Sequence, residues 1–168
     1  MLTEACGKRA KGWFLGAVTI GAFAGFSGMM ATAMADSSYT RSVTIKRNVD
    51  DVWAALVTKS IVDTYYFLPV SADITAADQS IYYGTSDQQL ITGKVLELQS
   101  PSTFKHSFKF AGQEQANSIV TYSLEAQDYA TKLTVTHEGY EMDTQSYADI
   151  AGGWPIILDG MKSKLEGK

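Results

Sequence analysis

Residues 152–168 read GGWPIILDGMKSKLEGK, and this stretch decides how the rest of the chain must fold. Its apolar residues recur every three or four positions, at Trp154, Ile157, Leu158, Met161 and Leu165. That spacing places them on one face of a helix. The segment is too short and too charged to cross a bilayer, which takes about 20 apolar residues. We therefore expect a helix whose apolar face packs against the rest of the domain.

Two residues of this helix have a predicted role of their own. Proline lacks a backbone N–H and favours the first helical turn, so Pro155 is expected close to the helix start. Glycine inside a helix costs roughly 1 kcal/mol relative to alanine. Gly160 lies beside the apolar face, where we expect it to let the helix approach the sheet or a ligand.

The residues before this helix predict a sheet. Arg41–Arg47 alternates apolar and polar residues like a half-buried strand, and Asn48 can cap a helix that follows it. Residues 61–69 predict a second short helix that ends at Pro69. Short stretches rich in β-branched and aromatic residues then predict six strands joined by hairpins. These are SADIT (71–75), SIYYGT (80–85), LITGKVLELQ (90–99), STFKHSFKF (102–110), SIVTYSLEAQ (118–127) and TKLTVTHEG (131–139). The order predicts an α+β fold in which a curved antiparallel sheet packs against the C-terminal helix.

Residues 1–35 have the three parts of a secretory signal peptide. Positive charges come first, an apolar run extends from Trp13 to Met30, and small residues precede a cleavage site after Ala35. Cleavage leaves 133 residues, 36–168, as a single domain that is periplasmic or secreted. The alternative is an uncleaved N-terminal membrane anchor. The one cysteine, Cys6, lies in the leader, so the mature domain has no disulfide and no thiol chemistry.

The charge of the mature domain argues against a nucleic-acid partner. The whole chain has 14 basic and 18 acidic residues, and removal of the leader leaves 11 and 17, a net charge of −6. A polyanion would be repelled by such a surface.

Several motifs together resemble the START-like (SRPBCC) superfamily, and within it the group related to the activator of the Hsp-90 ATPase. They are VTIKRNVDDVWAAL (43–56), YYGT (82–85), ITGKVLEL (91–98) with Pro101, KLTVTHEGY (132–140) and GGWPIILDGMKSKLE (152–166). The resemblance implies a helix-grip fold, with a seven-stranded antiparallel sheet around the C-terminal helix and a cavity between them. Members include lipid and hormone carriers, polyketide cyclases and aromatases, and co-chaperones, so the fold alone does not fix the function. Export would separate this chain from a cytosolic chaperone.

Strand parity points an aromatic and histidine-bearing face into the fold. Phe104, His106 and Phe108 share one side of their strand, and Tyr122 and His137 lie on the inward sides of the next two. Turns centred near residue 114 and at residues 129–130 would align His106, Tyr122 and His137 in one row across the sheet.

We interpret this face as the wall of a binding site, because small-molecule sites combine aromatic side chains with a few polar groups. The candidate ligand-binding residues are Tyr65, Tyr66, Tyr83, Phe104, His106, Phe108, Tyr122, His137, Trp154 and Met161. In the alternative interpretation these aromatics are core, and both histidines bond to Tyr122 or to backbone. No residue can be assigned as catalytic. A metal site is not expected, since histidines two strands apart lie roughly 10 Å from each other. No cofactor is predicted either.

The sequence thus predicts an exported START-like protein that binds a hydrophobic or aromatic small molecule between sheet and helix. One alternative is an acid–base enzyme of cyclase-like or hydrolytic type that uses His106, Tyr122 or His137. The other is an interaction or co-chaperone-like module with a filled core.

Overall fold

Alternating apolar and polar residues build an antiparallel β-sheet. A computed structural model describes residues 38–113, 117–140 and 144–167. The predicted signal peptide, residues 1–35, lies outside them. The elements are β1 (Ser38–Ile45), α1 (Val49–Val57), α2 (Lys59–Val62), β2 (Ser80–Gly84), β3 (Gln89–Gln99), β4 (Thr103–Phe110), β5 (Ser118–Gln127), β6 (Ala130–Glu138) and α3 (Thr144–Glu166). In the described residues the sheet has six strands, in the order β1-β6-β5-β4-β3-β2. The prediction of an α+β helix-grip fold is confirmed.

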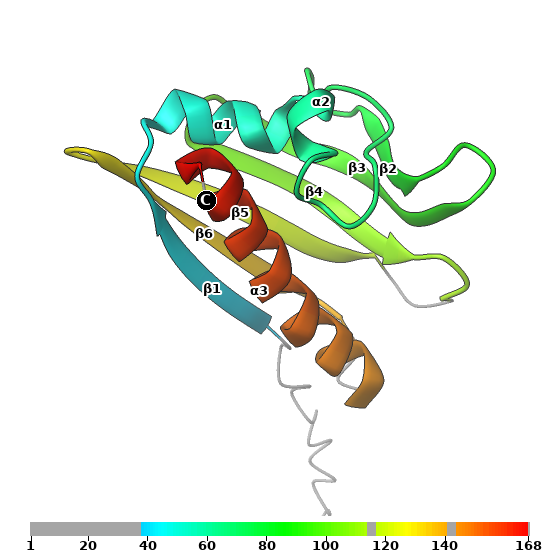
Figure 1. The fold of residues 1–168 in the computed structure, drawn as a ribbon. Helices are drawn as coiled ribbons and strands as arrows, with labels where there is room; N and C mark the ends of the chain where they lie inside the picture. Colours follow the sequence, from blue (N-terminus) through cyan, green and yellow to red (C-terminus); the bar gives the residue numbers. More distant parts are fainter. Residues whose placement is uncertain (1–37, 114–116, 141–143, 168) are drawn as a thin grey trace, which may run out of the picture. The chain divides into compact units, whose positions relative to one another are not determined.

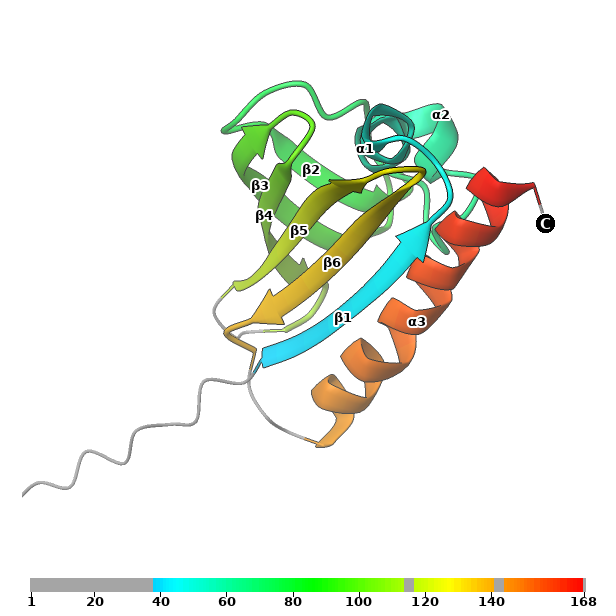
Figure 2. The same ribbon diagram turned by 90° about the vertical axis from the view of Figure 1, so that its left-hand side faces the viewer.

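The helices lie over apolar side chains that would otherwise be exposed to solvent. Figures 1 and 2 show α3 running along the sheet beside β1, with α1 and α2 across one end. The side chain of Asn48 caps α1 as predicted, because its Oδ1 accepts a hydrogen bond of 2.8 Å from the N–H of Asp51. No helix among the described residues is long and apolar enough to cross a membrane.

The long helix α3 begins earlier than the sequence suggested. It has 23 residues and encloses Pro155, so the prediction that Pro155 lies in the first turn is wrong. The reason is that the apolar face continues one turn further back, where Ile150 is buried on the same side as Trp154. Burial of both residues outweighs the backbone hydrogen bond that proline cannot make.

Polar contacts attach the C-terminal half of α3 to the outer strand β1. The guanidinium of Arg41 pairs with the carboxylate of Asp159 at 3.1 Å. The ammonium of Lys162 donates to the carbonyl of Thr44. Each exposed contact contributes little on its own. Together they cover part of a strand edge that would otherwise be open.

Gly160 brings α3 close to the connection after α2. A Cβ added to Gly160 would lie 3.3 Å from the carbonyl oxygen of Tyr65. Gly160 therefore allows α3 to approach the loop after α2. The sequence had suggested that it would approach the sheet or a ligand instead.

The predicted strand at residues 71–75 is not formed, and the sheet has six strands in the described residues where the family resemblance implied seven. The segment instead forms hydrogen bonds with backbone groups at the end of α1 and the start of α2. Asp73 Oδ1 accepts a hydrogen bond of 2.7 Å from the N–H of Lys59, and the N–H of Ile74 donates to the carbonyl of Val57 at 2.8 Å. Val70, directly before this segment, makes an isolated bridge to Tyr83 in β2.

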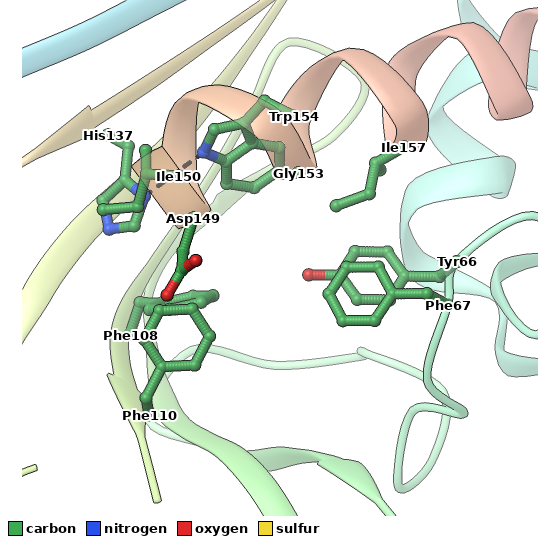
Figure 3. A pocket seen from close by; sticks show the side chains of 10 residues that line it. All are labelled: Tyr66, Phe67, Phe108, Phe110, His137, Asp149, Ile150, Gly153, Trp154 and Ile157. Atoms are coloured by element: carbon green, nitrogen blue, oxygen red, sulfur yellow. Dashed lines mark hydrogen bonds between the residues drawn. The ribbon is translucent and has the colours of Figure 1, made fainter. Parts of the chain in front are cut away.

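The second helix is shorter than predicted. It ends at Val62, and residues 63–69 form turns. Asp63 directs this change, because its Oδ1 accepts a hydrogen bond of 2.9 Å from the N–H of Val70 and closes a compact loop. The loop brings Tyr66 and Phe67 beside α3 (Figure 3).

The predicted parity of the strands is confirmed, but the predicted register is wrong. Phe104, His106, Phe108, Tyr122 and His137 are all buried. His106 lies opposite Val120 and not opposite Tyr122, and Val120 in turn lies opposite His137. Each hairpin turn is centred one residue earlier than expected, which moves each pairing by two residues. In both pairings the residue of β5 is Val120, where Tyr122 had been predicted. His106 and His137 therefore still lie in one row across the sheet, with Val120 between them.

Candidate functional site

A small apolar pocket opens between the N-terminal half of α3, β4 and the loop after α2 (Figure 3). Its volume is about 30 Å³, enough for roughly two water molecules. It is lined by Tyr66, Phe67, Phe108, Phe110, His137, Asp149, Ile150, Gly153, Trp154 and Ile157. Sites for drug-sized ligands usually measure roughly 300–1,000 Å³. As it stands, the pocket therefore admits only a compact chemical group.

Aromatic rings occupy the space behind this pocket. Tyr66 stacks on Tyr83 with a centroid separation of 4.6 Å, and Phe104 stacks on Tyr122 at 5.4 Å. His106 stacks on Phe104 at 5.0 Å. These rings come from β2, β4, β5 and the loop after α2, and their packing fixes the inner wall of the pocket.

His137 is the centre of a buried chain of hydrogen bonds. The indole N–H of Trp154 donates to Nδ1 of His137 at 3.2 Å (Figure 3). Since an indole N–H can only donate, Nδ1 is an acceptor, and neutral His137 carries its proton on Nε2. Nε2–H then donates to Ser118 Oγ at 2.7 Å, and the Ser118 hydroxyl donates to the carbonyl of Phe108 at 3.0 Å. Both ring nitrogens of His137 are therefore engaged.

His106 is held by one nitrogen only. Its Nδ1–H donates to the carbonyl of Ser107 at 2.8 Å, which fixes the opposite tautomer from His137. Nε2 is buried and has no hydrogen-bond partner among the described residues. Gly93 makes this arrangement possible, because a Cβ there would lie 2.0 Å from the Ser107 carbonyl oxygen.

Burial keeps both histidines neutral. It lowers the pKa of His106 to about 4, an effect that the hydrogen bond to Ser107 partly opposes. Burial also lowers the pKa of His137 to about 4, and the neighbouring His106 adds to this. Burial raises the pKa of Tyr66, Tyr83 and Tyr122 above that of free tyrosine. These histidine and tyrosine side chains are therefore uncharged near neutral pH.

The structure divides the predicted site residues into two groups. Tyr66, Phe108, His137 and Trp154 line the pocket together. The others do not line it: Tyr83, Phe104, His106, Tyr122 and Met161 are buried in the core, and Tyr65 donates its hydroxyl proton to the carbonyl of Ala55 at 2.8 Å. The alternative interpretation expected histidine bonds to Tyr122 or backbone. Ser107 provides a backbone bond to His106, whereas His137 bonds to Ser118 and Trp154.

Sequence reasoning missed most of the rim. Phe67 and Phe110 stand at the opening, and Asp149, Ile150 and Gly153 come from the first half of α3. The helix was expected to begin near Gly152, so the residues before it were not considered as helical. Only the alternation in β4 pointed to Phe110, which shares a face with Phe108.

No three histidine, cysteine or acidic side chains lie close enough to hold a metal ion within the part of the chain that the structure describes. The arrangement thus offers ring faces and one carboxylate to a ligand. Its described residues include no charged acid–base pair.

A family model described as "Activator of Hsp90 ATPase homolog 1-like protein" matches residues 46–166. The sequence matches no curated protein. Among solved structures, protein MLL2253 from Mesorhizobium loti is 17% identical with a TM-score of 0.71, over 79% of this chain and 98% of that one. An Hsp90 activator from Plasmodium falciparum is 16% identical with a TM-score of 0.66, over 77% of this chain and 96% of that one.

DynU16, from the dynemicin biosynthetic locus, is 22% identical with a TM-score of 0.69. The alignment covers 78% of this chain and 48% of DynU16, so this chain spans about half of that protein. At such identities, these similarities establish the fold.

Proposed function

Because the chain belongs to the Activator of Hsp90 ATPase homolog 1-like family, whose fold sets a long helix against a curved sheet, we propose that it is an exported binding protein. Its ligand is a small apolar or aromatic molecule, one end of which enters the pocket between α3, β4 and the loop after α2. That DynU16 comes from a biosynthetic locus supports a small-molecule role.

The observation that carries this proposal is an apolar opening walled by aromatic rings from separate parts of the chain. Phe108 and Phe110 of β4 meet edge to face at 4.9 Å, and Tyr66 and Phe67 stack at 4.8 Å. Trp154 of α3 forms a further part of the wall (Figure 3). Such rings give a large contact area at little cost in conformational entropy.

The rim supports the same proposal. The side chain of Phe67 is 56% exposed, although it stands beside buried rings. An apolar ligand that covered Phe67 would remove its surface from water, at a gain of about 25 cal/mol per Å². Since Phe67 lies in a turn, its movement can widen the opening without displacing a strand.

Acid–base catalysis is not part of this proposal. A general base needs a free lone pair within reach of its substrate. The two nitrogens of His137 are occupied by Trp154 and Ser118, and His106 lies behind the pocket wall.

Two neighbouring glycines allow a direct test. A Cβ added at Gly152 or at Gly153 meets no atom of the described residues within 4 Å, and of the two glycines it is Gly153 that lines the pocket. Calorimetric titration with toluene and phenol should detect binding to the wild type and to the Gly152→Leu variant. The Gly153→Leu variant should bind neither probe, because its side chain fills the opening.

Equal binding by Gly152→Leu and Gly153→Leu would place any ligand elsewhere. Absence of binding to the wild type would reject the proposal. The alternative function, an interaction module with a filled core, would then be favoured. The Hsp90 activator from Plasmodium falciparum is the structurally similar protein that supports this alternative.

A further inference from the structure

The pocket combines aromatic faces with the carboxylate of Asp149. Among the described residues that line the pocket, Asp149 is the one with a charged side chain, since burial keeps His137 neutral. Figure 3 shows the carboxylate of Asp149 beside the rings of Phe108 and Phe110, with the hydroxyl of Tyr66 pointing into the pocket from the opposite side.

This combination favours a positively charged organic group. The face of an aromatic ring carries negative electrostatic potential and attracts an ammonium group within about 6 Å of its centroid. A carboxylate at the same opening adds to that attraction, whereas it repels an anion and is indifferent to a neutral apolar molecule. The net charge of the chain, −4, also favours the approach of cations.

The same wall disfavours an inorganic cation. Calcium takes about six to eight oxygen ligands, and magnesium needs a near-octahedral set. From the described residues the pocket offers the carboxylate of Asp149 and the phenol hydroxyl of Tyr66 among apolar side chains. A methylated ammonium group carries its own apolar surface and is weakly hydrated, so it loses less on entering such a site.

The size of the opening sets which part of a ligand enters. A volume of about 30 Å³ accepts a compact head only. The rest of the molecule would extend past the exposed ring of Phe67 into solvent. Tyr66 would then face the head from the loop side, and Asp149 from the helix side.

We infer that the ligand of this pocket is an organic cation whose ammonium or methylated ammonium head lies between the aromatic rings and Asp149. The inference rests on the proposed function, to which it adds the charge of the ligand. It makes Asp149 the residue that distinguishes a cation from a neutral molecule of the same shape.

The test compares two probes that differ in one atom. Choline has a quaternary nitrogen where 3,3-dimethyl-1-butanol has a carbon, so the two share size and shape. Each is titrated into the full-length protein while the Trp154 indole and Gly153 amide resonances are followed by NMR. Choline should bind more tightly than the alcohol by about threefold to tenfold, the effect of an exposed cation–π contact and a solvated charge pair.

Two variants test whether Asp149 causes the preference for choline over the alcohol. Asp149→Asn should remove most of it. Asp159→Asn takes the same charge from the same helix at a position that faces Arg41, and it should leave the preference unchanged. Gly153→Leu should abolish binding of both probes.

Equal affinities of choline and the alcohol for the wild type would overturn the inference, as would a preference that survives in Asp149→Asn. Both results would leave the proposed function standing, since a molecule still binds. If neither probe binds, the inference fails. The titrations with toluene and phenol then decide separately whether the proposed function fails with it.

Discussion

Trp154 Nε1 of α3 donates a hydrogen bond of 3.2 Å to Nδ1 of His137 in β6, and this contact joins the long helix to the sheet beside the pocket. Both residues line the pocket, so the same bond shapes the candidate site and stabilises the fold. It also fixes the histidine tautomer on which the hydrogen bond to Ser118 depends.

Replacing Trp154 by Phe keeps an aromatic ring and removes the donor. Nδ1 of His137 would then be a buried acceptor without a partner, so we expect the free energy of unfolding to fall by about 2 kcal/mol. Urea denaturation followed by circular dichroism measures this change. Trp53→Phe in α1 is the control for lost ring size, and an equal loss in both variants would show that the hydrogen bond contributes nothing specific.

The partner on the other side of His137 can be tested in the same way. Ser118→Ala removes the hydroxyl that accepts from His137 and donates to the carbonyl of Phe108, so we expect a loss of about 1–3 kcal/mol in unfolding free energy. Ser123→Ala, at an exposed position of the same strand, should change the stability by less than about 0.5 kcal/mol. Similar values for the two variants would contradict the hydrogen-bond chain.

The neutral histidines predict a pH dependence of stability. Folding lowers the pKa of each from the usual 6.5 to about 4, so the unfolded chain binds protons that the folded chain does not. Stability should therefore be constant above about pH 7 and fall below about pH 6.5, with a slope that approaches 1.4 kcal/mol per pH unit for each histidine.

NMR can measure these pKa values directly, because the chain has two histidines and no others. Nitrogen-resolved spectra at pH 7 should show the proton of His137 on Nε2 and that of His106 on Nδ1. Titration of either ring near pH 6.5 in the folded protein would contradict its burial.

Gly93 should be intolerant of any side chain. A Cβ at this position would lie 2.0 Å from the Ser107 carbonyl oxygen, which also accepts the hydrogen bond from His106. Gly93→Ala should therefore lower the unfolding free energy by about 3 kcal/mol or prevent folding. Gly152→Ala, which meets no atom, should raise stability by up to about 1 kcal/mol, so that thermal melts of the two variants shift in opposite directions. A melting temperature for Gly93→Ala at or above that of the wild type would refute the close contact.

Much of the fold was predictable because strand faces follow a simple period. Alternation placed His106, Tyr122 and His137 on the buried face whatever the register. Register depends on where each hairpin turns, and a turn one residue earlier moves the opposite partner by two positions. For that reason the hydrogen bond between His137 and Ser118 could not be predicted from the sequence. The residues around Ser118 do not identify Ser118 as a partner of His137.

The site was less predictable because loops and helix starts depend on tertiary contacts. Pro155 favoured a late helix start, yet burial of Ile150 extends the helix through Asp149 and Gly153. The loop that carries Phe67 to the rim depends on one side-chain bond from Asp63 to the N–H of Val70. Tyr65 looked equivalent to Tyr66 in sequence, but its hydroxyl bonds to the carbonyl of Ala55.

The most direct measurement for the central claim is the position of a bound ligand relative to Trp154. Proton–proton nuclear Overhauser effects recorded with toluene and the full-length protein should connect the ligand to the Trp154 indole and to the rings of Phe67 and Phe108, and these contacts should disappear in Gly153→Leu. Contacts to other residues, or none at saturating ligand, would contradict a binding site between α3, β4 and the loop after α2.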